Sequence, residues 1–139
     1  MKTYLDHVAI AVKNINESTK IFEALGFEFS DHREIVESQE VKTAFCKIDE
    51  NAKIELLEPT SDTSTIAKFI EKKGEGIHHL CFKVENVLET QEKLKNQGFK
   101  LIYDEPFVGA GNCLVNFVHP KSANGCLIEI SESRGETNV

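Results

Sequence analysis

The sequence predicts an α+β fold built from two tandem βαβββ modules, and two internal correspondences indicate it. Shifted by 72 residues, residues 6–29 align with residues 78–101 without a gap. A second match, shifted by 74 residues, relates residues 53–58 to residues 127–132. A repeat of this length is typical of a duplicated structural unit. Six positions of the first match are identical: His7 and His79, Val12 and Val84, Asn14 and Asn86, Glu17 and Glu89, Gly26 and Gly98, Phe27 and Phe99.

Each module begins with a strand and a helix. Residues 4–12 alternate in polarity, which places His7 on the same face as the small side chains of Ala9 and Ala11. Asn14 and Glu17 match a capping box, so a helix is expected over residues 15–24. Gly26 suits the left-handed residue that ends it. The second module repeats this pattern with a strand over residues 77–84 and a helix over residues 87–97.

Three strands are expected after each helix. They cover residues 27–35, 41–48 and 52–58 in the first module, and residues 99–103, 113–119 and 126–131 in the second. A linking helix is predicted over residues 63–72, capped by the cluster at residues 61–63. We therefore expect a single domain over residues 1–139. It divides into repeat 1 (about 4–59), the linking helix (about 61–74), repeat 2 (about 76–132) and a frayed tail (133–139).

Charge and composition exclude some partners. The net charge of −7 and the pI near 5.2 argue against nucleic acid and anionic membranes, which bind basic surfaces. No apolar run approaches the roughly 20 residues that span a bilayer, and no leader is recognisable, so a cytoplasmic location is expected. The four cysteines form no C-x-x-C motif and are predicted to be reduced residues, mostly in the core.

Four residues form the candidate metal site. Each half opens with a histidine on a strand and closes with a glutamate on a strand, and the glutamates alternate with bulky apolar neighbours. A glutamate on a buried face is costly unless it is paired or bound to a cation. Two imidazoles and two carboxylates suit Co²⁺, Ni²⁺, Mn²⁺ or Zn²⁺ and leave positions open for a substrate. The predicted ligands are His7, Glu55, His79 and Glu129.

A purely structural interpretation competes with this one. A single strand histidine is more often hydrogen-bonded than metal-bound, and a single strand glutamate usually faces water. The repeat-equivalent placement of all four residues favours the metal. His78 is expected on the opposite face of its strand, His119 is a lesser candidate, and His32 is expected at the surface.

Several motifs resemble the vicinal oxygen chelate superfamily, which includes glyoxalases, bleomycin resistance proteins and dioxygenases. They are Asp-His-Val-Ala (6–9), Ile-Glu-Leu-Leu-Glu-Pro (54–59), Gly-Ile-His-His (76–79), Tyr-Asp-Glu-Pro (103–106) and His-Pro-Lys-Ser (119–122) with the trailing Leu-Ile-Glu (127–129). Within the superfamily the chain is most similar to methylmalonyl-CoA epimerases. The resemblance implies a half-barrel of two βαβββ modules around a divalent metal held by the four ligands above, and often a homodimer.

The resemblance also implies a reaction, the removal of a proton next to a carbonyl. We expect a metal-stabilised enolate, with Glu129 as one acid/base and Glu55, or an unidentified group, as the other. Lys121 and Ser122 are candidates for holding the substrate carboxylate or the phosphates of an acyl-CoA. One departure concerns Thr43, where some relatives carry a glutamate, so the second base stays open.

Other functions remain alternatives. The same ligand set is that of metal-dependent lactoylglutathione lyase (glyoxalase I), which isomerises a thiohemiacetal. A non-enzymatic, small-molecule-binding member of the superfamily would not need the four metal-type residues. An extradiol dioxygenase would use two histidines and a single carboxylate, so Glu55 counts against it.

Overall fold

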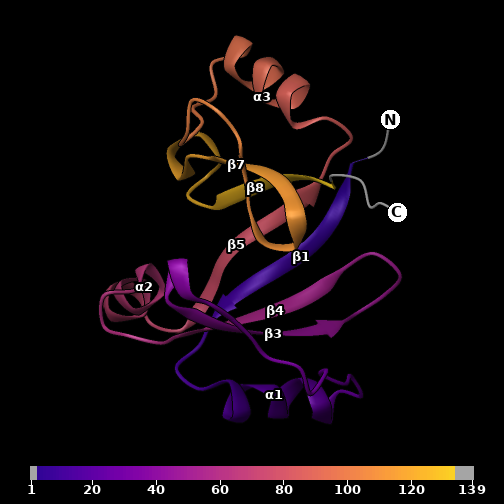
Figure 1. The fold of residues 1–139 in the computed structure, drawn as a ribbon, viewed down its shortest axis with the longest axis vertical. Helices are drawn as coiled ribbons and strands as arrows, with labels where there is room; N and C mark the ends of the chain where they lie inside the picture. The colour runs from indigo at the N-terminus through magenta and orange to yellow at the C-terminus, as the bar shows by residue number, and fades with distance from the viewer. Residues whose placement is uncertain (1–2, 134–139) are drawn as a thin grey trace. The chain divides into compact units, whose positions relative to one another are not determined.

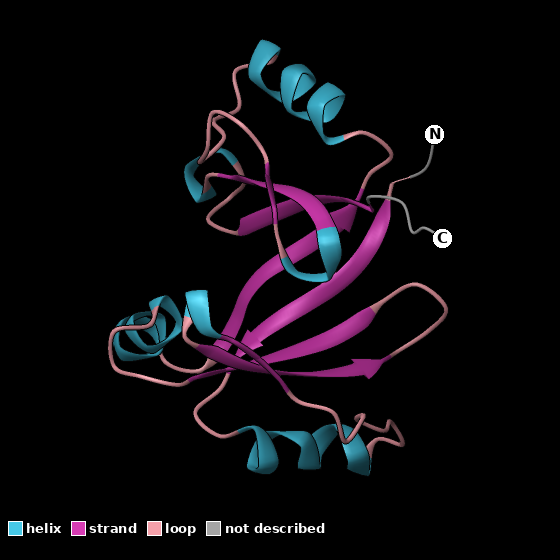
Figure 2. Ribbon diagram, in the orientation of Figure 1, coloured by secondary structure: helices cyan, strands magenta, loops and turns pink. Residues whose placement is uncertain are grey.

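The structure is a computed structural model that describes residues 3–133, so the predicted tail lies outside the described residues from residue 134 onward. The chain divides into two compact units, and each contains one βαβββ module (Figure 1, Figure 2). One unit spans residues 7–78. The other spans residues 79–139 and includes the chain start up to Asp6. The predicted α+β class with two βαβββ modules is confirmed.

The first unit contains a sheet with the strand order β2-β3-β4-β1. β1 and β4 pair in parallel, whereas the other neighbours are antiparallel. A short 3-10 helix, η1 (Glu37–Gln39), precedes β3. The elements are β1 (Tyr4–Ala11), α1 (Ile15–Ala24), β2 (Glu34–Val36), β3 (Val41–Lys47), β4 (Lys53–Pro59) and α2 (Thr65–Lys73).

Both faces of this sheet carry a helix. On one face, Ile15 of α1 packs with Val12, Ala44 and Leu56, and Figure 1 shows α1 running beside β3 and β4. On the other face, Ile66 of α2 packs against an apolar cluster from three strands: Ala9, Ala11, Val41 and Leu57. Burial of these side chains stabilises the unit by roughly 25 cal/mol for each Å² removed from water.

The second unit repeats the arrangement in the order β5-β8-β7-β6. Helix α3 packs on one face through Val87 and Leu94, which meet Val84, Ile130 and Leu101 in two clusters. The elements are β5 (Gly76–Lys83), α3 (Val87–Asn96), β6 (Phe107–Val108), η2 (Ala110–Asn112), β7 (Cys113–Val118), η3 (Pro120–Ser122) and β8 (Leu127–Ser133).

The module helices begin in the same way. The side chains of Asn14 and Asn86 accept hydrogen bonds from the backbone N–H groups of Glu17 and Glu89, each at 2.9 Å, as the sequence predicts. A further carboxylate caps each helix: Glu58 accepts from the N–H of Ile15 and Glu132 from that of Val87, both at 2.8 Å. These bonds satisfy N–H groups that have no partner within the helix. Of the two glutamates near the end of each half, the later one is therefore structural.

The predicted first strand after each helix is wrong in its extent. In place of residues 27–35 and 99–103, the structure has isolated bridges at Phe29 and Leu101, followed by the short strands β2 and β6. Polar and turn-forming residues interrupt both segments, and natural sheets keep their edge strands short. The edge of each sheet is therefore formed later in the chain than predicted.

The linking helix is correctly predicted, but α2 begins at Thr65, two residues after the predicted start at residue 63. Its cap is Ser64, whose hydroxyl accepts from the N–H of Ala67 at 2.9 Å. Ser61 and Thr63, the predicted capping residues, instead donate to the carboxylate of Glu40. The helices α1, α2 and α3 have only 10, 9 and 10 residues. None of the helices in the described part of the chain is long and apolar enough to cross a membrane.

Candidate metal centre

In the first unit, His7 and Glu55 meet on adjacent strands. His7 Nε2 lies 3.3 Å from Glu55 Oε1, and the two side chains are 11% and 13% exposed. β1 and β4 pair so that Ala9 lies opposite Glu55, and Ala9 shares a face with His7 because side chains alternate along a strand. Parallel pairing thus brings together two residues that are 48 positions apart in the chain.

In the second unit, His79 and Glu129 form an equivalent pair. His79 Nε2 lies 3.2 Å from Glu129 Oε1, and the side chains are 11% and 15% exposed. β5 and β8 are again parallel, with Cys81 opposite Glu129 as Ala9 is opposite Glu55. The structure therefore brings each predicted histidine to the glutamate of its own half, with nearly the same distance and burial.

A phenylalanine completes each pair and was missed by the sequence reasoning. The ring of Phe45 meets His7 edge-on, with centroids 6.3 Å apart, and Phe117 meets His79 in the same way at 6.2 Å. Phe45 lies opposite Glu55 in the β3–β4 register, and Phe117 lies opposite Glu129 in the β7–β8 register. The two phenylalanines are identical at the 72-residue shift, so extending the repeat past residue 29 finds them.

The buried cysteine next to the second pair is a neutral thiol. Burial raises the pKa of Cys81, and the charge of Glu129 together with a hydrogen bond to Glu129 raises it further. Burial also raises the pKa of Cys46. Neither thiol has the lowered pKa that favours a thiolate metal ligand. Both residues are 1% exposed, in keeping with their predicted core role, and all four cysteines are reduced.

The donor atoms of the two pairs fit a divalent transition metal. In each pair an imidazole Nε2 and a carboxylate oxygen converge in a nearly buried position. Imidazole and carboxylate are the donors that Zn²⁺, Co²⁺, Ni²⁺ and Mn²⁺ accept. Each half thus contributes two groups that can bind a metal.

The remaining sequence-selected residues lie elsewhere. His78 packs edge-on against Phe69 of α2, with ring centroids 5.0 Å apart. His119 precedes η3 and caps it, because its Nδ1 accepts from the N–H of Lys121. The hydroxyl of Ser122 accepts from the N–H of Lys100 at 2.9 Å. Binding of a substrate by Lys121 and Ser122 stays a prediction.

Thr43 faces the same side of its sheet as Glu55. It is 4% exposed and its hydroxyl donates to the backbone carbonyl of Glu34, its partner in the β2–β3 register. Directly opposed residues in an antiparallel pair share a face. The side chain of Glu34 is therefore a further carboxylate on this face, which the sequence did not reveal because the face depends on the pairing of Glu34 with Thr43.

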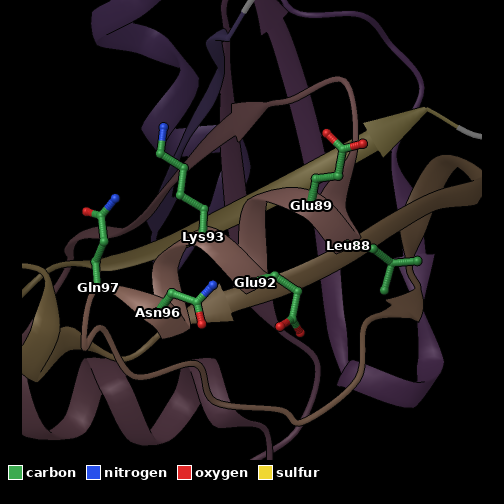
Figure 3. Close-up of a pocket in the computed structure, with 6 residues that line it drawn as sticks. All are labelled: Leu88, Glu89, Glu92, Lys93, Asn96 and Gln97. Carbon is green, nitrogen blue, oxygen red and sulfur yellow. The ribbon is translucent and has the colours of Figure 1, made fainter.

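A surface hollow on α3 is unrelated to these pairs. It is lined by residues of one helix alone, which Figure 3 shows as sticks: Leu88, Glu89, Glu92, Lys93, Asn96 and Gln97. In Figure 3 these side chains extend separately from the helix and do not converge on a common point. The lining includes no histidine or cysteine. Helix α3 packs on one face of the sheet, and His79 and Glu129 lie on the opposite face.

Comparison with known proteins identifies the family. Residues 6–117 match the profile of the Glyoxalase/Bleomycin resistance protein/Dioxygenase superfamily. The chain belongs to this superfamily. The matched segment includes His7, Glu55 and His79, while Glu129 lies beyond its end.

Similar proteins cover almost the whole chain. "Uncharacterized protein YqjC" of Bacillus subtilis is 38% identical over 133 residues, which cover 95% of this chain and 94% of that protein. The ethylmalonyl-CoA/methylmalonyl-CoA epimerase of Cereibacter sphaeroides is 38% identical, with coverages of 92% and 96%. A solved methylmalonyl-CoA epimerase in complex with methylmalonyl-CoA and NH4+ superimposes with a TM-score of 0.86 at 32% identity, covering all of both chains.

Proposed function

We propose that this protein is a metal-dependent epimerase of methylmalonyl-CoA. The observation that carries the proposal is the duplicated buried pair, His7 with Glu55 and His79 with Glu129, at repeat-equivalent positions. The epimerases among its relatives, and their coverage of the whole chain, support the choice of substrate. The C2 hydrogen of methylmalonyl-CoA lies next to the thioester carbonyl and is acidic enough for a carboxylate to remove.

The two pairs are proposed to hold one metal in common. A single imidazole and a single carboxylate are fewer than the three or more protein ligands that catalytic metal sites use. Four groups from two equivalent halves supply a complete set, with positions open for a substrate. When bound, such an ion supplies Lewis acidity that stabilises negative charge on the thioester oxygen.

The carboxylates are proposed to move the proton. Inversion at carbon requires a base on one face of the substrate and an acid on the other. Glu129 takes one role and Glu55 the other, since the duplication gives both the same immediate surroundings: an imidazole and a phenylalanine ring. Their low exposure limits competition from water for the proton.

The test uses one enantiomer of methylmalonyl-CoA in D₂O. We expect inversion of the substrate together with deuterium at C2, both followed by NMR, and loss of both after the metal is removed by a chelator. Addition of Co²⁺, Ni²⁺, Mn²⁺ or Zn²⁺ one at a time then identifies the ion that restores turnover. A metal-loaded protein that neither inverts the substrate nor exchanges its C2 hydrogen contradicts the proposal.

Glyoxalase I-type isomerisation is a second candidate. Glu55 favours it, because two histidines and two glutamates are the ligand set that resembles metal-dependent lactoylglutathione lyase, and Thr43 supplies no extra carboxylate. This reaction likewise begins with removal of a proton next to a carbonyl, although the proton returns to the adjacent carbon, so the same residues can serve. Methylglyoxal mixed with glutathione or another thiol is the discriminating substrate, and formation of the hydroxyacyl thioester is the result that favours this candidate.

A further inference from the structure

Three polar residues of the second unit gather on the face that carries His79 and Glu129. Lys83 Nζ lies 3.4 Å from Cys113 Sγ and 3.5 Å from Ser131 Oγ. Lys83 shares its face of β5 with His79, four residues before it, and Ser131 shares its face of β8 with Glu129. Cys113 follows on the neighbouring strand β7. The cluster therefore lies on three adjacent strands, β5, β8 and β7, on the metal-binding face.

The first unit has no such cluster at the equivalent positions. The repeat relates Lys83 to Ala11, Cys113 to Val41 and Ser131 to Leu57. These three counterparts are buried and packed beneath Ile66 and Phe69 of α2. In the second unit, the only α-helix among the described residues, α3, packs on the opposite face. The polar residues thus replace apolar ones on a face that no α-helix of residues 79–133 covers.

The charged ammonium of Lys83 has only weak hydrogen-bond acceptors. Burial opposes its charge, yet Cys113 and Asp6 together raise the pKa of the Lys83 ammonium. Its acceptors are a thiol, which is a weak acceptor, and a hydroxyl at the limit of hydrogen-bond distance. Among the described residues no carboxylate forms an ion pair with it. A half-buried ammonium normally has a stronger partner, because burying a charge without one is costly.

From this cluster we propose an anion-binding site in which Lys83 and Ser131 hold a carboxylate or phosphate group of the ligand. Ser131 is 3% exposed, and because its hydroxyl accepts from Lys83 it still has its own hydrogen to donate. The glycine-containing loop at residues 109–112 lies alongside, since Cys113 Sγ donates to the carbonyl of Gly111 at 3.7 Å. That loop has no bulky side chain to obstruct the approach of a ligand.

The identity of the anion rests on the proposed function. An acyl-CoA carries both candidate groups, the acyl carboxylate and the phosphates of the coenzyme. Lys83 follows His79 by four positions on β5, a distance of about 13 Å along a strand. The acyl carboxylate is attached to the reacting carbon, whereas the phosphates of the coenzyme lie far from it. This spacing therefore favours a phosphate as the anion at Lys83, and the carboxylate is the alternative that the experiment distinguishes.

The experiment measures binding by calorimetry with three probes: inorganic phosphate, free coenzyme A and methylmalonate. Lys83→Met removes the charge at nearly constant length, and Lys83→Arg retains it. The matched control is Lys93→Met, on the outer surface of α3 in the same unit. Thermal melts establish that each variant is folded. We expect Lys83→Met to weaken binding of the responsive probe by about ten- to a hundred-fold, the effect of losing a charged hydrogen bond.

The outcomes separate the sources and the two proposals. If Lys83→Met weakens the binding of phosphate and coenzyme A but not of methylmalonate, the site binds phosphate. If it weakens the binding of methylmalonate alone, the site binds a carboxylate. In both cases Lys83→Arg and Lys93→Met should bind like wild type. Either result supports the anion site even if the protein has no epimerase activity. Equal binding of all three probes by wild type and a folded Lys83→Met variant overturns the inference, as does wild type that binds none of them.

Discussion

The two halves of this protein are alike where the metal is proposed and different around it. Each half has a histidine, a glutamate and a phenylalanine in the same register, and His–Glu distances of 3.3 and 3.2 Å. Further along the same faces, the first half is apolar beneath α2, whereas the second carries Lys83, Cys113 and Ser131. The two copies thus share the same donor atoms but differ at the positions of Lys83, Cys113 and Ser131, which are apolar in the first half.

The opposite faces show a second difference. Asn116 is fully buried and donates to Gln91 at 2.8 Å and to the carbonyl of Tyr103 at 3.0 Å. The repeat counterparts are Ala44 and Thr19, and Ala44 packs in the apolar cluster beneath α1. At this position the first half therefore has an alanine held by van der Waals contacts, and the second half has an asparagine held by hydrogen bonds. The duplication preserves the backbone arrangement and allows different side-chain interactions to stabilise it.

The largest expected effect tests whether the two pairs act as one centre. His7→Ala and His79→Ala should each abolish stoichiometric metal binding, because a shared ion loses a ligand from either side. Elemental analysis of wild type should find one metal per chain, and each variant far less. Two ions in wild type, with one retained in each variant, is the result expected of independent half-sites and contradicts a shared centre.

The next effect concerns the roles of the two glutamates. Glu129→Gln and Glu55→Gln should each lower the rate of inversion by roughly 10²–10⁴-fold, because a positioned base is lost. If each glutamate serves one face, each variant should still exchange the C2 hydrogen of one enantiomer in D₂O. Glu34→Gln serves as the comparison, since Glu34 lies on the same face at the sheet edge. Unchanged exchange of both enantiomers removes the substituted glutamate from the mechanism.

An exchange of residues between halves tests the effect of α2. Ala11→Lys introduces a charge at a position with 0% exposure beneath Ile66 and Phe69 and should destabilise the fold by about 3 kcal/mol or more. Lys83→Ala, the reverse exchange, should change stability by less than about 1 kcal/mol, since it removes only weak hydrogen bonds. Urea unfolding measures both. Equal losses of unfolding free energy in the two variants would mean that the cover of α2 over Ala11 does not make the two positions different.

The buried amide network should have a smaller effect. Asn116→Ala should cost about 1–3 kcal/mol of unfolding free energy, because Gln91 is left buried without this donor. The double variant with Gln91→Thr reproduces the residues of the first half and should recover part of the loss. Calorimetric melts provide the comparison. Strictly additive losses in the double variant are the contrary outcome, because residues in one network are expected to be coupled.

The smallest effect is expected at the helix caps. Glu58→Ala and Glu132→Ala should each cost about 1 kcal/mol, because each removes the acceptor of one helical N–H group. The two losses should agree closely, since both bonds are 2.8 Å long. The ion pair of Glu58 with Lys42, at 3.9 Å on the surface, should add little. A difference above about 1 kcal/mol would show that the caps are not equivalent.

Much of the site was predictable from the repeat. His7 and His79 coincide at the 72-residue shift, and the matched segments around Glu55 and Glu129 coincide at 74. Each half therefore has a histidine and a glutamate on strands with apolar neighbours. This repeated pattern alone was enough to select His7, Glu55, His79 and Glu129. The helices and their asparagine caps were predicted for the same reason: helix starts depend on residues within one turn.

The edge strands, Glu34 and the Lys83 cluster were not predictable in this way. They depend on which strands become neighbours and in what register, and local patterns do not encode the pairing of residues far apart in the chain. The sequence by itself determined the duplication, the module class and the residue types of the proposed metal centre. Only the tertiary structure decided which sheet faces carry a helix, because α2 covers Ala11 in the first half whereas α3 packs on the face opposite Lys83 in the second.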